Sequence, residues 1–469
     1  MEGPARPADP TASARAARRA RPVRPCRPDR TAPGERPRGR SLAVVGAAVV
    51  SATLAAGCAA PEGATEPLRS EVAYQPVSLD EAPALDGVLA ANDALGAAML
   101  SSSDATNAVA SPFGAYVALS MLAEGARGDT AAAFDAALGA AGADRTASVS
   151  ALREALLAYD GDPTLAAADQ LPAAPLLHLA DRVVLDDELD VEPDFLAALA
   201  RGYDAGVDTT DLGVAAAKAV LDEWVNRETG GLVRSSAITP HPDLRVVLQD
   251  AIVLAARWRV PFEPSDTAPA AFATGTDMVD VDTLHGTAEA DWTAHDVDGW
   301  TSVRLPYVEG FVADLVLPPA GTDPADVSLD VLGGLRTGAE ATDLAQGRPI
   351  GVAVPVLDLE PGPLDLLLAL DAVGLGELSR LSDLPDLGGI TTTENLVLAQ
   401  AAQQARLTLD EGGTVAAAVT ELAADSTAAQ VQPADAFVVT FDRPFLLRVA
   451  DAETGLTLFL AAVRDPSAG

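Results

Sequence analysis

A run of small residues near the C-terminus, 410–420, constrains the fold more than any other feature. It follows a strand-like run at 405–409, and strand-like sequence resumes about twenty residues later at 437–441. Strand side chains alternate between two faces with period two. Extended as a strand, the segment has one uncharged face, with Thr414, Ala416, Ala418, Thr420, Leu422, Ala424 and Ser426, and a second face with Val415, Ala417, Val419, Glu421, Ala423 and Asp425. The sequence predicts a loop that can become a strand, with its uncharged face directed to a core and its acidic face directed to water.

The chain is strongly acidic outside its first forty residues. Its 31 Lys and Arg face 68 Asp and Glu, a net charge of −37, although residues 1–40 alone hold 11 Arg and only four acids. An acidic body repels phosphate backbones and anionic lipids, so we expect no nucleic-acid partner. The simpler alternative is that the charge serves solubility.

The N-terminal region indicates export. We expect residues 1–40, rich in Arg and Pro, to be a disordered arm. The uncharged, apolar segment 41–58 is typical of a signal peptide and is too short for a confident membrane span. It ends at Cys58 in a sequence that resembles a bacterial lipobox, which predicts lipidation; free secretion with an incidental cysteine is the alternative. Residues 59–80 form the expected tether, and the body beyond holds no cysteine for a disulfide.

Residues 81–469 are expected to form one folded domain. The pattern predicts helices within 85–138 and at 215–227 and 363–374, strands at 176–185, 244–254, 396–410 and 437–463, and a β-rich region at 270–320 with turns at His285-Gly286 and Glu309-Gly310. Strands and helices are segregated more than they alternate, which favours an α+β fold.

No enzymatic or metal-binding motif stands out. The four histidines are scattered, and none is paired at an i, i+4 ligand spacing. No phosphate-binding loop or nucleophile elbow occurs in a strand-to-helix context, so we expect no cofactor. A Ser/His/Asp triad stays open, because its members need not be close in sequence.

Sequence blocks in the family's order resemble the serpin family from about residue 83 to 466. They are Asn107–Pro112 with Met121–Thr130, Trp224–Gly231, Val247–Ala251, Trp258–Phe262, Leu305–Tyr307, Asp383–Ile390 and Val439–Val449. The resemblance implies an α+β fold of three β-sheets, about eight to nine helices and an exposed reactive loop at about 411–433. It also implies a metastable fold.

The function implied by this resemblance is suicide-substrate inhibition of an extracellular serine protease, through a covalent acyl complex. A monomer is expected. The hinge of the loop would be Glu411, Gly412, Gly413, Thr414, Val415, Ala416, Ala417 and Ala418. The glycine pair would supply the backbone freedom that insertion of the loop requires.

The reactive bond is expected between Thr427 and Ala428, within a wider window of 424–431. That window holds no Lys or Arg, which favours an elastase-like or subtilisin-like target over a trypsin-like one. The competing function is a non-inhibitory serpin, a carrier or interaction module at the cell surface, although the small uncharged hinge disfavours it. A chaperone-like or substrate-binding lipoprotein is a third alternative.

The positions that would control opening of the central sheet depart from the family pattern. The resemblance places Asn107, Ser111 and Pro112 beneath the sheet and Trp258 and Glu411 at its top. It also assigns Asp250 and Gln403 to the positions that control opening. Gly114 stands where a second serine is usual, Asp250 replaces an expected Asn, and Gln403 stands where many members have His. Because Gln can still bridge backbone groups, we expect a retuned gate.

Overall fold

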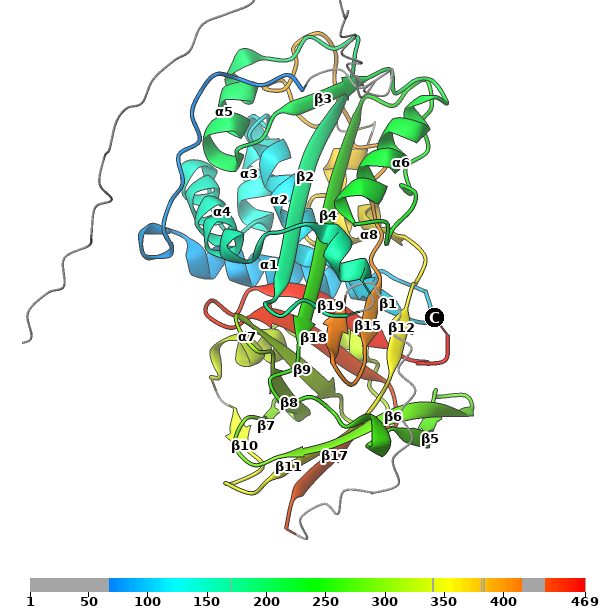
Figure 1. Cartoon of the computed structure of the whole chain (residues 1–469). Coiled ribbons are helices and arrows are strands. Elements are labelled where there is room, and N and C mark those ends of the chain that lie inside the picture. Colours follow the sequence, from blue (N-terminus) through cyan, green and yellow to red (C-terminus); the bar gives the residue numbers. More distant parts are fainter. Residues whose placement is uncertain are drawn as a thin grey trace, which may run out of the picture. The chain divides into compact units, whose positions relative to one another are not determined.

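The computed structural model describes residues 67–168, 170–339, 341–380, 382, 384–415 and 435–468. The arm, signal segment and Cys58, the hinge positions Ala416–Ala418 and the bond at Thr427 and Ala428 lie outside these ranges. All described residues belong to one unit, Ala60–Gly469. Figure 1 traces their arrangement.

Eight α-helices lie within the described residues. They are α1 (Leu85–Ser101), α2 (Pro112–Ala123), α3 (Gly128–Ala137), α4 (Gly142–Leu156), α5 (Pro193–Tyr203), α6 (Ala217–Glu228), α7 (Leu329–Thr337) and α8 (Leu366–Ala372). Short 3-10 helices are η1 (Leu79–Glu81), η2 (Leu157–Tyr159), η3 (Pro163–Ala167), η4 (Pro264–Asp266), η5 (Pro324–Asp326) and η6 (Gly376–Ser379). None of the helices described is long and apolar enough to cross a membrane.

The strands form three larger sheets and one small one. The six-stranded sheet has the order β12 (Leu357–Leu359), β15 (Leu407–Leu409), β16 (Gly413–Val415), β4 (Val246–Arg257), β2 (Leu176–Asp186) and β3 (Val207–Thr210). The seven-stranded sheet has the order β1 (Ala108–Ala110), β19 (Thr457–Val463), β18 (Phe445–Asp451), β9 (Phe311–Leu317), β8 (Trp300–Pro306), β7 (Thr293–Val297) and β10 (Thr342–Asp343). The four-stranded sheet has the order β17 (Phe437–Thr440), β11 (Ile350–Pro355), β6 (Met278–Ala288) and β5 (Ala268–Ala273), and β13 (Leu364–Asp365) pairs with β14 (Ala402–Gln403). The α+β class is confirmed.

Helices cover both faces of the six-stranded sheet. Neighbouring residues of β4 point to opposite faces. Asp250 points toward Gly114 of α2, whereas Ala251 packs with Trp224 and Val225 of α6. Figure 1 shows α6 on one side of the long strands β2 and β4, with α2 behind them. Because both faces are covered, these two strands are mainly apolar.

Three details differ from the sequence expectations. His285 and Gly286 do not form a turn but lie inside β6, paired with β11. A Cβ on Gly286 would lie 2.8 Å from the rings of Phe262 and Trp292, so this glycine permits close packing and not chain reversal. The helix expected from residue 363 begins at Leu366, because 364–365 pairs with β14 first. Only 402–403 and 407–409 of the run 396–410 are strand.

The seven-stranded sheet is built around a buried arginine. Arg448, on β18, is fully buried and bonds Asp314 of β9 at 2.8 Å and the hydroxyl of Thr457 at 2.9 Å. Arg304 holds the other side of the Asp314 carboxylate. Every residue of β18 and β19 is buried, so water cannot replace a lost partner.

We expect Arg448→Met to destabilise the fold by about 3–5 kcal/mol, because it leaves a buried carboxylate short of one cation. The matched control is Arg406→Met, which breaks a half-exposed pair with Asp358 and should cost about 0–1 kcal/mol. Denaturant-unfolding midpoints of the two variants give the comparison. Equal losses would show that the buried pair is not a main support of this sheet.

Candidate functional site

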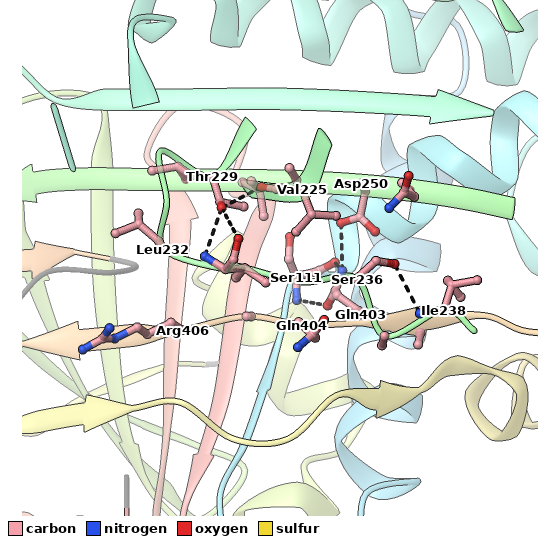
Figure 2. Close-up of a pocket in the computed structure, with 18 of the residues that line it drawn as sticks. Ser111, Val225, Thr229, Leu232, Ser236, Ile238, Asp250, Gln403, Gln404 and Arg406 are labelled. Carbon is pink, nitrogen blue, oxygen red and sulfur yellow. Dashed lines mark hydrogen bonds between the residues drawn. The ribbon is translucent and has the colours of Figure 1, made fainter. Parts of the chain in front are cut away.

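The six-stranded sheet contains a gap. On one side β4 pairs with β2 over ten residues, 176–185 with 246–255. On the other side it pairs with β16 over three residues only, 255–257. Below β16 lies a cavity of about 40 Å³ between residues 248–253 of β4 and residues 402–406 (Figure 2). β16 is therefore lodged at the top of an opening that continues beneath it.

The start of the hinge is anchored by aromatic side chains. The Trp258 ring stacks on Tyr307, with ring centroids 4.5 Å apart. The indole N–H of Trp258 donates to the carbonyl of Asp410 at 2.9 Å, and its backbone N–H donates to Gly412 at 3.0 Å. The Tyr307 hydroxyl donates to Thr414 at 2.6 Å, and Thr414 is fully buried. Thr414 thus faces the core, as the alternating pattern predicts.

Glu411 and Asp410 fix the turn that leads into β16. The Glu411 carboxylate accepts from Thr267 at 2.6 Å, and its carbonyl accepts from Phe262 at 2.9 Å. The Asp410 carboxylate accepts the backbone N–H groups of Gly412 and Gly413. Burial raises the pKa of Asp410, while these two N–H groups oppose that rise.

Gly413 is required for a different reason from the backbone freedom that was expected. Neither hinge glycine adopts a positive φ. A Cβ on Gly413 would instead lie 2.1 Å from the carbonyl oxygen of Ala256, so only glycine lets the two strands approach. In the observed state this glycine is required by close contact.

Val415 corrects the expectation that its face of the loop meets water. The side chain is 4% exposed and packs in a cluster with Ala166 of η3 and Leu176 of β2. Because the segment around η3 covers this part of the sheet, β16 is buried on both faces. Alternation along one strand could not show what a distant segment covers.

Gln403 connects the two sides of the gap. Its side-chain oxygen accepts the backbone N–H of Ser111 at 2.7 Å, and its amide nitrogen donates to the Ser111 carbonyl at 2.8 Å. The same nitrogen donates to the Asp250 carboxyl at 3.0 Å. Gln403 thus bridges backbone groups, the behaviour expected of it. Pro112 occupies the first turn of α2 directly after Ser111.

Asp250 is a buried carboxyl group that lies opposite a second carboxyl group. It lies opposite Asp181 in the β2–β4 pair, and Arg153 of α4 forms an ion pair with Asp181. Burial, followed by the nearby Asp181, raises the pKa of Asp250 to about 7, and the Gln403 hydrogen bond opposes the rise. Burial also raises the pKa of Asp181, against the effect of Arg153.

Gly114 is explained by Asp250. A Cβ at position 114 would lie 2.3 Å from Oδ2 of Asp250, so the carboxyl occupies the space where a side chain would stand. The two departures from the family pattern, Gly114 and Asp250, therefore belong together, because the carboxyl of one fills the space that the other leaves free. Among the residues that the structure describes, the Ser111 hydroxyl finds no hydrogen-bond partner, and Ser111 borders the cavity.

Asn107 makes its contacts with the C-terminal segment. Its amide donates to the carbonyl of Asp465 at 2.7 Å, and its oxygen accepts the N–H of Arg464 at 2.9 Å. Asn107 therefore holds the chain segment after β19 in place. It is not part of the hydrogen-bonded group formed by Ser111, Asp250 and Gln403.

Two basic residues of β2, missed by the sequence analysis, attach α6 over the gap. Arg182 donates to Gln249 of β4 and to Asp208 of β3, and lies 4.7 Å from the centre of the Trp224 ring. His178 lies between Asp160 at 2.9 Å and Glu228 at 3.1 Å. The Glu228 hydrogen bond is the main cause that raises the pKa of His178. The sequence signal that could have identified these two residues is their position as charged or titratable residues inside a long apolar strand.

The family comparison agrees with this architecture. A model described as serpin (serine protease inhibitor) matches residues 93–466. The chain belongs to the serpin family. Most serpins are serine protease inhibitors and not enzymes, some are non-inhibitory, and most are secreted.

Similar proteins come from distant organisms. Iripin-8 of Ixodes ricinus is 28% identical over 383 residues, which cover 80% of this chain and 92% of that protein. A serpin-like protein of Thermococcus kodakarensis is 26% identical over 373 residues, covering 77% and 82%. Among solved structures, the native state of tengpin, a thermophilic serpin, has a TM-score of 0.68 at 19% identity and covers 86% of this serpin and all of that chain. Thyroxine-binding globulin with thyroxine has a TM-score of 0.62 at 23% identity, covering 82% and 99%. At these identities the structures show the fold alone.

We expect Gly114→Ala to destabilise this serpin by about 1–3 kcal/mol, because the added methyl group overlaps the Asp250 carboxyl. The matched control is Gly333→Ala in α7, where a Cβ meets nothing within 4 Å. There alanine should be neutral or should stabilise by about 0.5–1 kcal/mol. Thermal unfolding of both variants measures the difference; a neutral Gly114→Ala would refute the packing explanation.

Proposed function

We propose that this serpin is a suicide-substrate inhibitor of an extracellular serine protease and acts by inserting its reactive loop into the six-stranded sheet. The observation that carries the proposal is β16, which lies between β15 and β4 at the upper end of the gap. A short paired segment with an open cavity below it is a suitable starting point for strand addition.

The chemistry belongs to the protease. Its serine attacks the carbonyl carbon of the loop bond, the bond breaks, and the new amino terminus leaves. The loop remains as an ester on the protease. The part of the loop before the bond then extends β16 downward between β4 and residues 402–409. About 14 residues at about 3.3 Å each carry the attached protease about 45 Å, which distorts it before water can release it.

The register of β16 predicts what the inserted loop would meet. Thr414 lies opposite Ala256 on β4 and opposite Leu409 on β15. If this antiparallel register continues, residue 420 lies opposite both Asp250 and Gln403. The core-facing residues on the way, Ala416 and Ala418, are small. Up to residue 420, insertion therefore brings no large or charged side chain into the core.

The target is inferred from the residues around the reactive bond. The expected bond, Thr427–Ala428, and the window 424–431 contain no Lys or Arg. Small residues suit an elastase-like or subtilisin-like pocket. The proposed place of action is outside the cell, with the domain tethered to the membrane surface by lipid on Cys58 or released.

We expect the purified protein to form an SDS-stable adduct with an elastase-like protease, and Thr414→Arg to be cleaved without forming it. An arginine at this buried site leaves an unpaired guanidinium that costs several kcal/mol. The control is Thr276→Arg, an exposed position. Gel analysis and titration of the protease count adducts. An undiminished adduct in Thr414→Arg would remove hinge insertion, and no adduct from the wild type would favour a non-inhibitory serpin.

We expect Cys58→Ala to move the mature protein from the membrane to the medium, because the variant lacks the acceptor for the lipid. Cys26→Ala is the control, since that cysteine lies before the signal segment. Fractionation of expressing cells followed by mass spectrometry of the mature amino terminus gives the result. Equal release of both variants and the wild type would contradict lipidation.

A further inference from the structure

We infer that Asp250, together with Asp181, is a proton-controlled lock on the opening of the six-stranded sheet between β4 and residues 402–409. The protonated carboxyl keeps the gap closed, and loss of the proton favours opening. The role of the lock in inhibition rests on the proposed loop insertion. The lock itself does not, because opening of the sheet can be measured without a protease.

The geometry provides two carboxyl groups and one cation. Asp181 and Asp250 are opposed on neighbouring strands and point to the same face of the sheet. Arg153 of α4 pairs with Asp181, so one negative charge is matched. A second negative charge at Asp250 would face Asp181 in a buried site. Like charges in such a place favour the neutral form of one member.

The other elements around Asp250 bring no charge, within the described chain. α2 contributes Gly114, which closes directly on the carboxyl. β14 contributes the neutral amide of Gln403. α1 and α8 contribute leucines, Leu95, Leu366 and Leu370. Apart from Asp181 and, through it, Arg153 and His178, no titratable group that we describe at this site acts on Asp250.

Asp250 is also placed to respond when the sheet opens. Its contact across the gap is the hydrogen bond from Gln403, which in turn holds Ser111. The cavity beside it is bordered by Ser111 and Gln403. When β4 separates from residues 402–406, the Gln403 bond breaks and water or an inserted strand reaches the carboxyl. Either supplies the donors that an ionised carboxylate needs.

The direction of the pH effect follows from this difference. In the closed sheet the pKa of Asp250 is raised to about 7. In the open sheet it should approach the value of a hydrated aspartate, about 3.9. The closed form binds the proton more tightly, so its advantage is complete below about pH 4 and is lost as pH rises through about 7. Opening should therefore increase between these values and then level off.

The test is amide hydrogen exchange of peptides from β4 and 402–409 in the full protein, measured from pH 5 to 8.5 and corrected for the intrinsic pH dependence of exchange. The opening constant of the wild type should rise roughly tenfold or more, since each unit of pKa difference corresponds to a factor of ten. Asp250→Asn is isosteric and cannot titrate, so its opening constant should stay low and flat. Asp358→Asn, on the half-exposed side of the same sheet, should behave as the wild type.

Carboxyl carbon NMR of the wild type, with aspartates labelled, provides a measurement that needs no variant to fold. One buried aspartate should titrate near neutral pH. A midpoint near 4 for Asp250, or the same pH dependence of exchange in the wild type and Asp250→Asn, would overturn the lock. If exchange follows the lock but no protease adduct forms at any pH, the inhibitory function fails and the lock stands.

Discussion

The edge of β4 that faces the gap is the constraint on which the rest of this structure depends. Buried backbone N–H and C=O groups need hydrogen-bond partners, and a strand edge inside a sheet presents a row of them. Here β2 pairs with one edge along ten residues, whereas β16 meets the other along three. The fold is organised around this incomplete pairing: aromatic residues fix the top, Gln403 bridges the lower part, and α6 covers the front.

The lower part of the gap shows how a few substitutions act as one unit. Asp250 fills the space beside α2, so position 114 must be glycine, and the Gln403 amide has the length to reach both Ser111 and Asp250. Adding a side chain at position 114 alone creates a clash, and shortening Gln403 alone leaves the backbone groups of Ser111 unpaired. A gate of this kind depends on a carboxyl group whose charge the surrounding protein disfavours, and not on an imidazole.

Much of this could be read from the sequence, for identifiable reasons. The strands β2 and β4 were predictable because long apolar runs buried on both faces are distinctive. Thr414 was correctly placed because alternation along a strand is strict. Val415 was not, since η3, which covers it, is distant in sequence. Gly286 was misread as a turn because glycine marks close packing as well as chain reversal, and only the rings of Phe262 and Trp292 tell the two apart.

The front of the sheet sets a further condition on any strand that fills the gap. Residues Thr229, Ser236 and Ile238, after α6, border the same cavity, so an incoming strand must pass beneath them (Figure 2). The Thr229 hydroxyl donates to the carbonyl of Val225 and accepts the backbone N–H of Val233, which keeps this turn closed on itself. α6 is held on the sheet by polar contacts, Glu228 to His178 and Arg182 beside Trp224, and by apolar packing. The apolar part consists of Ala217, Leu221, Trp224 and Val225 of α6 with Val184, Val247 and Ala251 of the sheet. Because apolar burial as well as hydrogen bonds holds α6 on the sheet, a strand that fills the gap has to fit beneath this cover.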